Sequence, residues 1–368
     1  MSYLEQLLQG AEVEWSTLGD ERFVEISNSG RKPVKASERI PGNVPYYGAN
    51  NIQDYVEGYT HNGKYILIAE DGTASIEDYS IQWAIGKFWA NNHVHVLRGT
   101  EYVDSRFLFH YLKIVNFIPF LSGGGRAKLT KGKLIEIPIP IPPLSVQKEI
   151  VRILDTFTEL TAELTAELTA RKKQYDYYRE KLLRFKEGEV EWKTLGEVYK
   201  FQYGIGNTIP TSGGQYPVYG SNGVVGTHSE YNSEDSPVIG HIGAYAGIVN
   251  WGKGKHFVTY NGVICRLINE KVNSRYAYHQ LLNQDFNSLA KNSSQPFVSY
   301  KELNSVQIPI PSLEEQTRIV SILDKFDTLT TSISEGLPKE IELRKKQYAY
   351  YRDQLLDFNK LKIGHEKR

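Results

Sequence analysis

The chain has 368 residues, with 43 basic and 43 acidic side chains that give a formal net charge of zero. This length predicts two or more domains, and the neutral total argues against binding nucleic acid by overall charge, although local basic patches are not excluded. The single cysteine, Cys265, excludes an intramolecular disulfide framework and favours a reducing cytoplasm. No charged-then-apolar leader follows Met1 and no apolar run of about 18 residues occurs, so neither secretion nor a membrane span is predicted.

The first residues resemble the end of a helix. YLEQLLQGAEVEWSTLGD (3–20) is similar to YREKLLRFKEGEVEWKTLGE (178–197), which ends one long helical segment and opens the next globule. We therefore expect residues 1–10 to be a helix-tail remnant that packs beside residues 351–358, so that the chain ends lie close together. The chain then reads as two repeats of globule and helix, which implies a pseudo-twofold, nearly circular arrangement.

Two variable globules alternate with the helices, within 1–143 and 188–312. Both open with EVEW-x-TLG and close with a proline-rich segment, EIPIPIPPL or VQIPIPSL. Proline at alternate positions predicts an edge strand, because proline has no backbone donor. Short β-branched runs predict strands with tight turns, and one helix is expected in each globule, at 105–115 and 274–283. The fold class is therefore α+β, with two mixed, β-rich domains.

The loops of the globules carry the candidate binding residues. Asn, Gln, Arg and Lys can read base edges or hold phosphates, and Tyr can stack on bases. In the first globule the candidates are Arg31, Lys32, Tyr46, Tyr47, Asn50, Asn51, Asn91, Asn92, Arg126 and Lys128. In the second they are Asn207, Tyr219, Asn222, Tyr245, Lys253, Lys255, Tyr260, Asn261 and Gln295. Each loop taken singly is also explained by an ordinary glycine-rich turn.

Two long helical spacers are predicted at 144–187 and 313–360, followed by a short tail at 361–368. In the first spacer, apolar side chains recur at alternating steps of four and three from Ile150 to Phe185, which is typical of a helix that packs on a partner helix. The second spacer carries four more residues, and a break or kink is expected near 336–338 because Pro338 removes a backbone donor. A simple core-facing stripe is the alternative explanation of each pattern.

The distal parts of the spacers repeat closely. RKKQYDYYREKLLRF (171–185) and RKKQYAYYRDQLLDF (344–358) agree at eleven of fifteen positions. Because they repeat while the globules diverge, we expect both to face the same kind of partner. The predicted partner-binding residues are Arg171, Lys172, Lys173, Tyr177, Arg344, Lys345, Lys346 and Tyr350.

No catalytic pattern is found. The sequence has no phosphate-binding loop of the form G-x-x-x-x-G-K-[ST], no H-E-x-x-H zinc motif and no G-x-S-x-G elbow. The Asn/Asp-Pro-Pro-aromatic signature of adenine methylation is also absent, which argues against a standalone methyltransferase. We therefore predict a protein that is not an enzyme and has neither metal nor cofactor.

At this point the residues resemble a known family, the specificity subunits of type I restriction–modification systems. The resemblance rests on I-P-I-P-x-L-x-x-Q-x-x-I-V-x-I-L-D (139–155 and 308–324) and on the repeated RKKQYxYYR. The tandem TAEL repeat (161–168) is similar to the IC subgroup.

The resemblance implies that each globule is a target-recognition domain for one half of a bipartite site in double-stranded DNA. The two helical spacers would form an antiparallel coiled coil that sets the distance between the halves. The subunit would be non-catalytic and would recruit two methyltransferase and two motor-nuclease subunits, to which S-adenosylmethionine, ATP and Mg²⁺ would belong. A coiled-coil adaptor with two protein-binding modules is the alternative.

Overall fold

The computed structural model describes residues 2–123, 127–206, 209, 213–289, 296–332 and 334–358. The chain divides into two compact units, Met1–Glu163 with Ile341–Arg368, and Leu164–Glu340. Each unit holds one globule together with parts of the long helices. Helix α4 (Leu144–Leu183) is continuous through the boundary at residue 163, so neither unit ends where its globule ends.

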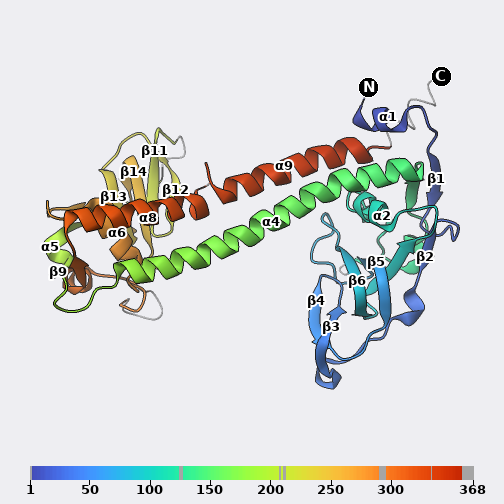
Figure 1. Cartoon of the computed structure of the whole chain (residues 1–368), viewed down its shortest axis with the longest axis horizontal. Coiled ribbons are helices and arrows are strands. Elements are labelled where there is room, and N and C mark those ends of the chain that lie inside the picture. The colour runs from blue at the N-terminus through green and yellow to red at the C-terminus, as the bar shows by residue number, and fades with distance from the viewer. Residues whose placement is uncertain are drawn as a thin grey trace. The chain divides into compact units, whose positions relative to one another are not determined.

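The globule of the first unit is built on a six-stranded sheet in the order β2-β7-β5-β6-β3-β4 (Figure 1). The strands are β2 (Val24–Ile26), β3 (Pro41–Tyr47), β4 (Ile52–Val56), β5 (His61–Ala69), β6 (Ile81–Ala90) and β7 (Val94–Gly99). Neighbouring strands are antiparallel except for β3 and β6, which run parallel. Short 3-10 turns occur at η1 (Asn28–Gly30), η2 (Ala36–Glu38) and η3 (Ile118–Phe120).

The second globule repeats this topology strand for strand, in the order β10-β15-β13-β14-β11-β12. The strands are β10 (Tyr199–Tyr203), β11 (Tyr216–Gly220), β12 (Gly223–His228), β13 (Ser233–Gly240), β14 (Val249–Val258) and β15 (Gly262–Leu267). Its single parallel pair, β11 with β14, occupies the same place in the order. The predicted α+β fold with two mixed domains is confirmed.

The proline-rich segments form the edge strands that the sequence predicts. In the first unit β8 (Pro138–Ile141) forms a two-stranded sheet with β1 (Glu14–Thr17). Pro138 and Pro140 have no backbone N–H, and an edge strand tolerates this because one of its sides is not paired with another strand. In the second unit β16 (Gln307–Ile310) pairs in the same way with β9 (Glu191–Thr194). Each proline-rich segment therefore joins the end of its globule to the beginning.

One helix in each globule lies against the sheet and a long helix (Figure 1). Helix α2 (Ser105–Leu112) is shorter than the predicted 105–115; Asp104 caps its start by accepting hydrogen bonds from two backbone amides. Its buried face, including Phe107 and Leu112, joins Ile150 of α4 in one core. The counterpart α6 (Ser274–Leu282) has Asn273 at its cap. Other short helices of the two globules are α3 (Lys131–Leu134), α5 (Leu195–Val198) and α7 (Tyr300–Ser305).

The second spacer is interrupted, where the sequence predicts a break. Helix α8 (Leu313–Thr331) ends before Gly336, which has a φ of +82°, and α9 (Leu337–Leu356) begins directly after it. Pro338 lies in the first turn of α9, where a helix tolerates proline because that amide needs no partner within the helix. The break therefore lies before Pro338, and a left-handed glycine directly precedes the new helix.

The spacer helices pack through matched aromatic pairs within each unit. In the first unit Phe157 of α4 stacks on Tyr351 of α9, with ring centroids 5.2 Å apart. In the second unit Phe326 of α8 stacks on Tyr178 of α4 at 5.6 Å. Each pair joins the start of one spacer copy to the RKKQYxYYR segment of the other. The chain thus packs antiparallel helices against each other in both units.

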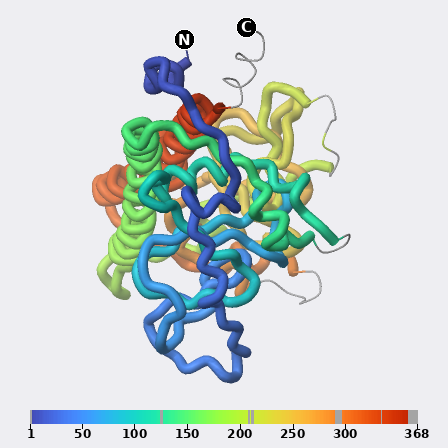
Figure 2. The backbone as a smooth tube through the Cα atoms, turned by 90° about the vertical axis from the view of Figure 1, so that its right-hand side faces the viewer, coloured from blue at the N-terminus to red at the C-terminus, as the bar shows by residue number. Residues whose placement is uncertain are grey.

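The predicted contact between the chain start and the second spacer is confirmed. Helix α1 (Tyr3–Leu8) lies beside the end of α9 in both views (Figures 1 and 2). Tyr3 meets Tyr351 edge to face, and Leu4 and Leu8 share a buried cluster with Leu355. Among the helices that the structure describes, none is long and apolar enough to cross a membrane.

Candidate nucleic-acid interface

In the first unit four loops meet beside the sheet. Asn50, after β3, donates to the carbonyl of Gly72 at 2.8 Å, which joins it to the loop after β5. The Glu70 amide donates to the carbonyl of His93 in the β6–β7 loop, at 2.8 Å. The Leu129 amide in turn donates to the Glu70 carbonyl at 2.7 Å. These contacts gather predicted residues from 50–51, 91–92 and 128 that are far apart in sequence.

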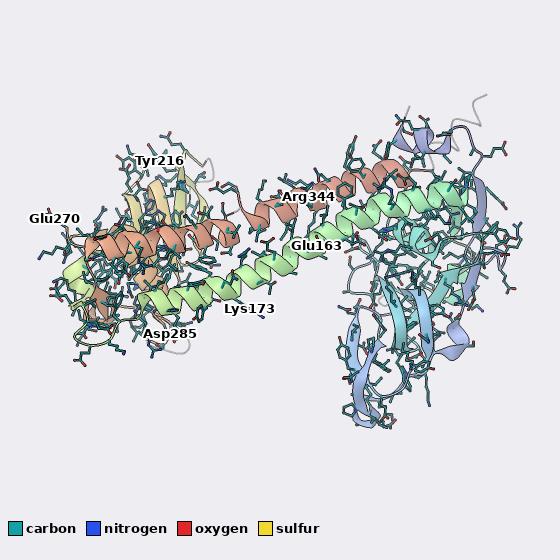
Figure 3. All side chains as sticks on the ribbon, in the orientation of Figure 1. Glu163, Lys173, Tyr216, Glu270, Asp285 and Arg344 are labelled. Carbon is teal, nitrogen blue, oxygen red and sulfur yellow. The ribbon has the colours of Figure 1, made fainter. Side chains whose placement is uncertain are left out.

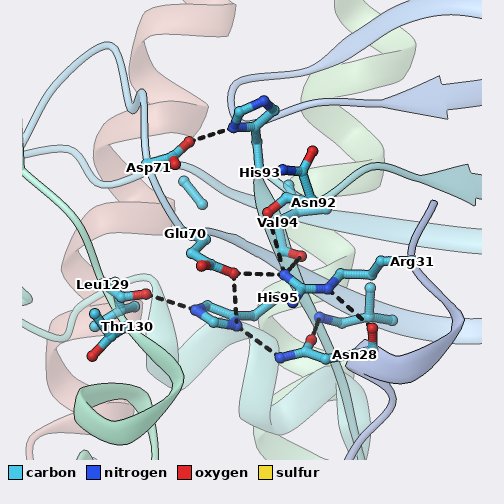
Figure 4. Close-up of polar contacts among 12 residues, drawn as sticks. Asn28, Arg31, Glu70, Asp71, Asn92, His93, Val94, His95, Leu129 and Thr130 are labelled. Carbon is cyan, nitrogen blue, oxygen red and sulfur yellow. Dashed lines mark hydrogen bonds and ion pairs between the residues drawn. The ribbon is translucent and has the colours of Figure 1, made fainter. Parts of the chain in front are cut away.

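A network of charged side chains supports these loops on the side of the sheet (Figure 4). Arg31 donates to Glu70 at 2.6 Å and to the Val94 carbonyl at 2.9 Å. Burial raises the pKa of the Glu70 carboxyl, but the hydrogen bonds from Arg31 and Lys128 bring that pKa below its ordinary value. Glu70 therefore stays ionised, and the largely buried Arg31 neutralises it. Arg31, predicted as a DNA contact, is used inside the domain.

His95 of β7 completes the network as a neutral imidazole (Figure 4). Its Nε2 lies 2.7 Å from the Leu129 carbonyl oxygen and must donate, so Nδ1 accepts from the side-chain amide of Asn28 at 2.9 Å. The Asn28 oxygen accepts from the Val96 amide, which fixes the orientation of the Asn28 side chain. Burial lowers the pKa of His95, in agreement with a neutral imidazole.

The outer layer of the same cluster presents mixed chemistry to solvent. Lys128 remains 45% exposed although its Nζ lies 3.2 Å from Glu70. Asn92 is exposed, and the exposed His93 ring is hydrogen-bonded through Nδ1 to Asp71. Among the described residues, none is hydrogen-bonded to His93 Nε2. His93 and Asp71 were not predicted as site residues. The one available signal was sequence position, because His93 directly follows the predicted Asn91 and Asn92.

Several other predicted residues of the first globule support the loops. Tyr46 is 2% exposed, and its hydroxyl lies 3.1 Å from the Val34 amide. Asn91 is also buried and accepts from the His93 amide, while Tyr47 packs its edge on Phe88. Tyr46 and Asn91 therefore position the loops and are enclosed by the protein. The exposed Asn51 accepts a hydrogen bond from the Ile52 amide, and Lys32 lies over the Trp89 ring. Arg126 lies outside the described residues.

In the second unit the corresponding loops surround a cavity of about 520 Å³. Its lining brings together three predicted residues, Asn222, Tyr245 and Asn261. Ser221 holds the loops in place, because its hydroxyl lies 2.8 Å from the carbonyl oxygens of both Ile242 and Asn261. The exposed Val224 and Val225 add apolar surface at the same cavity. Two amides, a phenol and apolar side chains are groups that can read a base-pair edge.

An aromatic cluster lies next to Asn261. Tyr203 stacks on Tyr300 at 4.0 Å and lies 5.5 Å from Tyr260, which is 44% exposed. Buried His241 packs on both Tyr203 and Tyr260, and its Nδ1 bonds to the Val298 carbonyl oxygen at 2.9 Å. Burial raises the pKa of Tyr300 to about 12, so its hydroxyl remains protonated at neutral pH. Tyr260 thus offers a supported ring face on which a base could stack.

The remaining predicted residues of the second globule lie elsewhere or outside the described ranges. Lys253 and Lys255 are exposed on β14, and Lys255 lies over the Tyr231 ring at 4.5 Å, away from the cavity lining. Tyr219 is half-buried, and its hydroxyl donates to the Trp251 carbonyl at 3.2 Å. Asn207 and Gln295 fall outside the described residues.

The repeated RKKQYxYYR segments, marked by Lys173 on α4 and Arg344 on α9 in Figure 3, each present exposed side chains. Tyr177 is 58% exposed and its counterpart Tyr350 is 63% exposed, whereas Tyr178 and Tyr351 turn toward the partner helix. The predicted lysines Lys172, Lys173, Lys345 and Lys346 are exposed, and Lys346 pairs with Glu342 in the same helix. Arg171 pairs with Glu167, and Arg344 donates to Gln347.

Among the residues that the structure describes, no three His, Cys, Asp or Glu side chains gather in a way that could hold a metal ion. Cys265 is buried and unpaired, and burial raises the pKa of its thiol far above the ordinary value. The site chemistry of the described residues is therefore that of hydrogen bonding, stacking and charge.

Comparison with known proteins shows where this architecture occurs. The family model described as type I restriction modification DNA specificity domain matches residues 11–171 and again residues 187–343. A Haemophilus influenzae protein named as type I restriction enzyme specificity subunit S.HindORF215P is 49% identical, over 97% of this chain and 99% of that protein. The EcoR124I/EcoR124II specificity subunit of Escherichia coli is 37% identical, over 98% of both chains.

A solved structure shares the fold. The type I restriction–modification S subunit from M. genitalium aligns with a TM-score of 0.72 at 19% identity, over 94% of this chain and 96% of that one. The double match of the family model, the two relatives and the duplicated fold agree. This chain belongs to the family of type I restriction–modification specificity subunits.

Proposed function

We propose that this chain is the DNA-reading subunit of a type I restriction–modification enzyme, with one half of a bipartite site read by each globule. The observation that carries the proposal is the duplication of the site. The two sheets have the same strand order, and asparagine side chains lie in corresponding loops of each. These are Asn50 and Asn92 in the first unit, and Asn222 and Asn261 in the second. The loops differ in sequence while the scaffold repeats, as two readers of different half-sites require.

The exposed groups suit the roles that DNA reading needs. Asn side chains can pair with adenine through two hydrogen bonds, and Lys128 can neutralise a phosphate. Tyr260 offers a stacking face, and Nε2 of the exposed His93 can meet a base edge or a phosphate oxygen. Buried groups such as Arg31 hold these side chains in place and do not contact the ligand.

Catalysis belongs to the partners in this proposal. The chain would recruit methyltransferase and motor-nuclease subunits, two of each, and S-adenosylmethionine, ATP and Mg²⁺ would bind to those subunits. The exposed, duplicated faces around Tyr177 and Tyr350 support a partner that is met twice. The family assignment favours this proposal over a protein-binding adaptor.

The test is to co-express the chain with its methyltransferase subunit and to sequence the methylated adenines. We expect a bipartite site, with Asn92→Ala relaxing one half and Asn261→Ala the other. Loss of one base contact costs about 1–3 kcal/mol. Asn62→Ala, at an exposed position on β5, is the control and should leave both halves unchanged. Methylation without a divided motif, or an identical effect of both variants, would refute the proposal.

A further inference from the structure

The repeated motif I-P-I-P-x-L-x-x-Q-x-x-I-V-x-I-L-D contains a fully buried glutamine that fixes each globule to its long helix. In the first unit Gln147 of α4 accepts from the Asp104 amide at 2.8 Å and donates to the carbonyls of Tyr102 and Pro142, at 3.1 and 2.7 Å. Asp104 is the cap of α2, so the glutamine holds the start of that helix.

The same three bonds occur in the second unit. Gln316 of α8 accepts from the Asn273 amide at 2.7 Å and donates to the carbonyls of Lys271 and Pro311, at 3.0 and 2.8 Å. Both glutamine side chains are fully buried. The contact therefore belongs to the repeat and is not peculiar to one globule.

A second contact lies eight residues further along each long helix. Asp155 accepts from Arg106 Nε and His110 Nε2 of α2, both at 2.8 Å. Asp324 accepts from Arg275 Nη2 and His279 Nε2 of α6, both at 2.7 Å. We call the two contacts of each unit its latch. The latch of the first unit consists of Gln147, Asp155, Arg106 and His110, and that of the second unit consists of Gln316, Asp324, Arg275 and His279. Each member of the second set follows its counterpart by 169 positions.

The latch arginine also touches the recognition sheet. Arg106 lies over the Trp83 ring of β6 with its Cζ 5.1 Å from the ring centroid. Arg275 lies over the Trp251 ring of β14 at 4.7 Å. Strands β6 and β14 lead directly to the loops that carry Asn92 and Asn261. Each arginine thus connects a carboxylate on the spacer helix to the strand that ends at the candidate interface.

We propose that Arg106 and Arg275 are positioning residues that fix the tilt of each recognition domain on its spacer helix and so restrict the spacings between half-sites that the protein accepts. The inference rests on the proposed reading of a bipartite site. Two anchor points eight residues apart are separated by about 12 Å of helix, and they resist rotation in a way that a single contact cannot.

The geometry makes small tilts significant. Trp83 and Ala90 are seven residues apart on β6, which is about 23 Å of strand. A tilt of about 9° at the latch would therefore move the following loop by about 3.4 Å, the rise of one base pair along DNA. A loosened latch should admit spacers that are one base pair longer or shorter. The bases read in each half should not change, because no loop residue is altered.

The experiment compares Arg106→Gln and Arg275→Gln with the wild-type chain, each co-expressed with the methyltransferase subunit, by sequencing methylated adenines. We expect unchanged half-sites and at least a fivefold rise in the fraction of methylated sites whose spacer differs by one base pair. Arg106→Lys, which retains the charge over Trp83, should restore most of the wild-type spacing. Arg152→Gln is the matched control, since Arg152 is exposed on α4 and pairs with Glu149 in the same helix.

The outcomes separate this inference from the proposed function. A wild-type chain that yields no bipartite motif refutes the proposed function. A bipartite motif whose spacer distribution is unchanged in both folded arginine variants refutes the latch inference alone. If the arginine variants fail to fold by circular dichroism, Trp83→Leu and Trp251→Leu test the same connection with the carboxylate pairs intact. An unchanged spacer in those variants would also overturn the inference.

Discussion

Replacement of the buried Gln147 by alanine should destabilise the first unit strongly. The change removes three hydrogen bonds and leaves one amide and two carbonyls without their partner. At about 1 kcal/mol for each bond, the loss of unfolding free energy should be about 3 kcal/mol. A cost of 1–3 kcal/mol for each group that stays dry raises this figure, and water entering the space left by the side chain lowers it.

The assay is urea unfolding of the complete chain followed by circular dichroism. Gln316→Ala should give a similar loss, because its three bonds match in partners and length. Gln174→Ala is the control; this exposed side chain on α4 accepts one bond from Arg171, and its removal should change the free energy by less than about 0.5 kcal/mol. A loss below about 1 kcal/mol at Gln147, or an equal loss at Gln174, would show that the latch glutamines do not anchor the globules.

Three further predictions concern charge and length. Burial raises the pKa of Asp324, but hydrogen bonds from His279 and Arg275 bring that pKa to about 2. The ionised carboxylate therefore stabilises the fold above about pH 4, and this stabilisation is lost between pH 4 and 2. Because the side chain is 36% exposed, the contribution should be about 1 kcal/mol. Asp324→Asn should flatten the acid-unfolding curve there, and an unchanged slope would contradict the assignment. Insertion of one further TAEL in α4 adds about 6 Å of helix and rotates the helix by about 40° beyond a full turn. Sequenced methylation sites should then show the same half-sites with a spacer longer by about one to two base pairs. An unaltered spacer would mean that α4 does not set the distance between the half-sites. Charge reversal of the lysine pairs in both RKKQY segments should weaken assembly with the methyltransferase subunit, and native mass measurements with unchanged complexes would exclude that role.

The repeats made much of the fold predictable from sequence. Local similarity between 3–20 and 178–197 placed α1 beside α9, because a duplicated sequence packs in a duplicated way. The helix break was also visible, although its cause was not. The predicted break rested on Pro338, whereas the left-handed backbone conformation lies at Gly336, two residues earlier.

The candidate interface was less predictable, because residue type does not report which partner a side chain finds. Arg31 looked like a DNA contact, but Glu70, 39 residues away, pairs with it. Tyr46 looked like a stacking residue and is buried, while the exposed His93 was not among the predicted site residues. In the same way, the sequence shows that the spacers repeat a glutamine and an aspartate, but it does not show what these side chains contact. Their partners on α2 and α6, or at the caps of these helices, lie more than 40 residues away.

The glycine that ends the turn before α9 bears on how the two halves of such a chain can diverge. A Cβ at Gly336 would lie 2.5 Å from the Thr328 carbonyl oxygen, so the position admits no other residue without a shift in backbone. The four additional residues of the second spacer are taken up around this turn, and Tyr351 still meets Phe157 as Tyr178 meets Phe326. A difference in length between the two spacers is therefore compatible with the same aromatic pair in each unit. In α4 no such turn exists, and every added or lost residue must be carried by the helix itself.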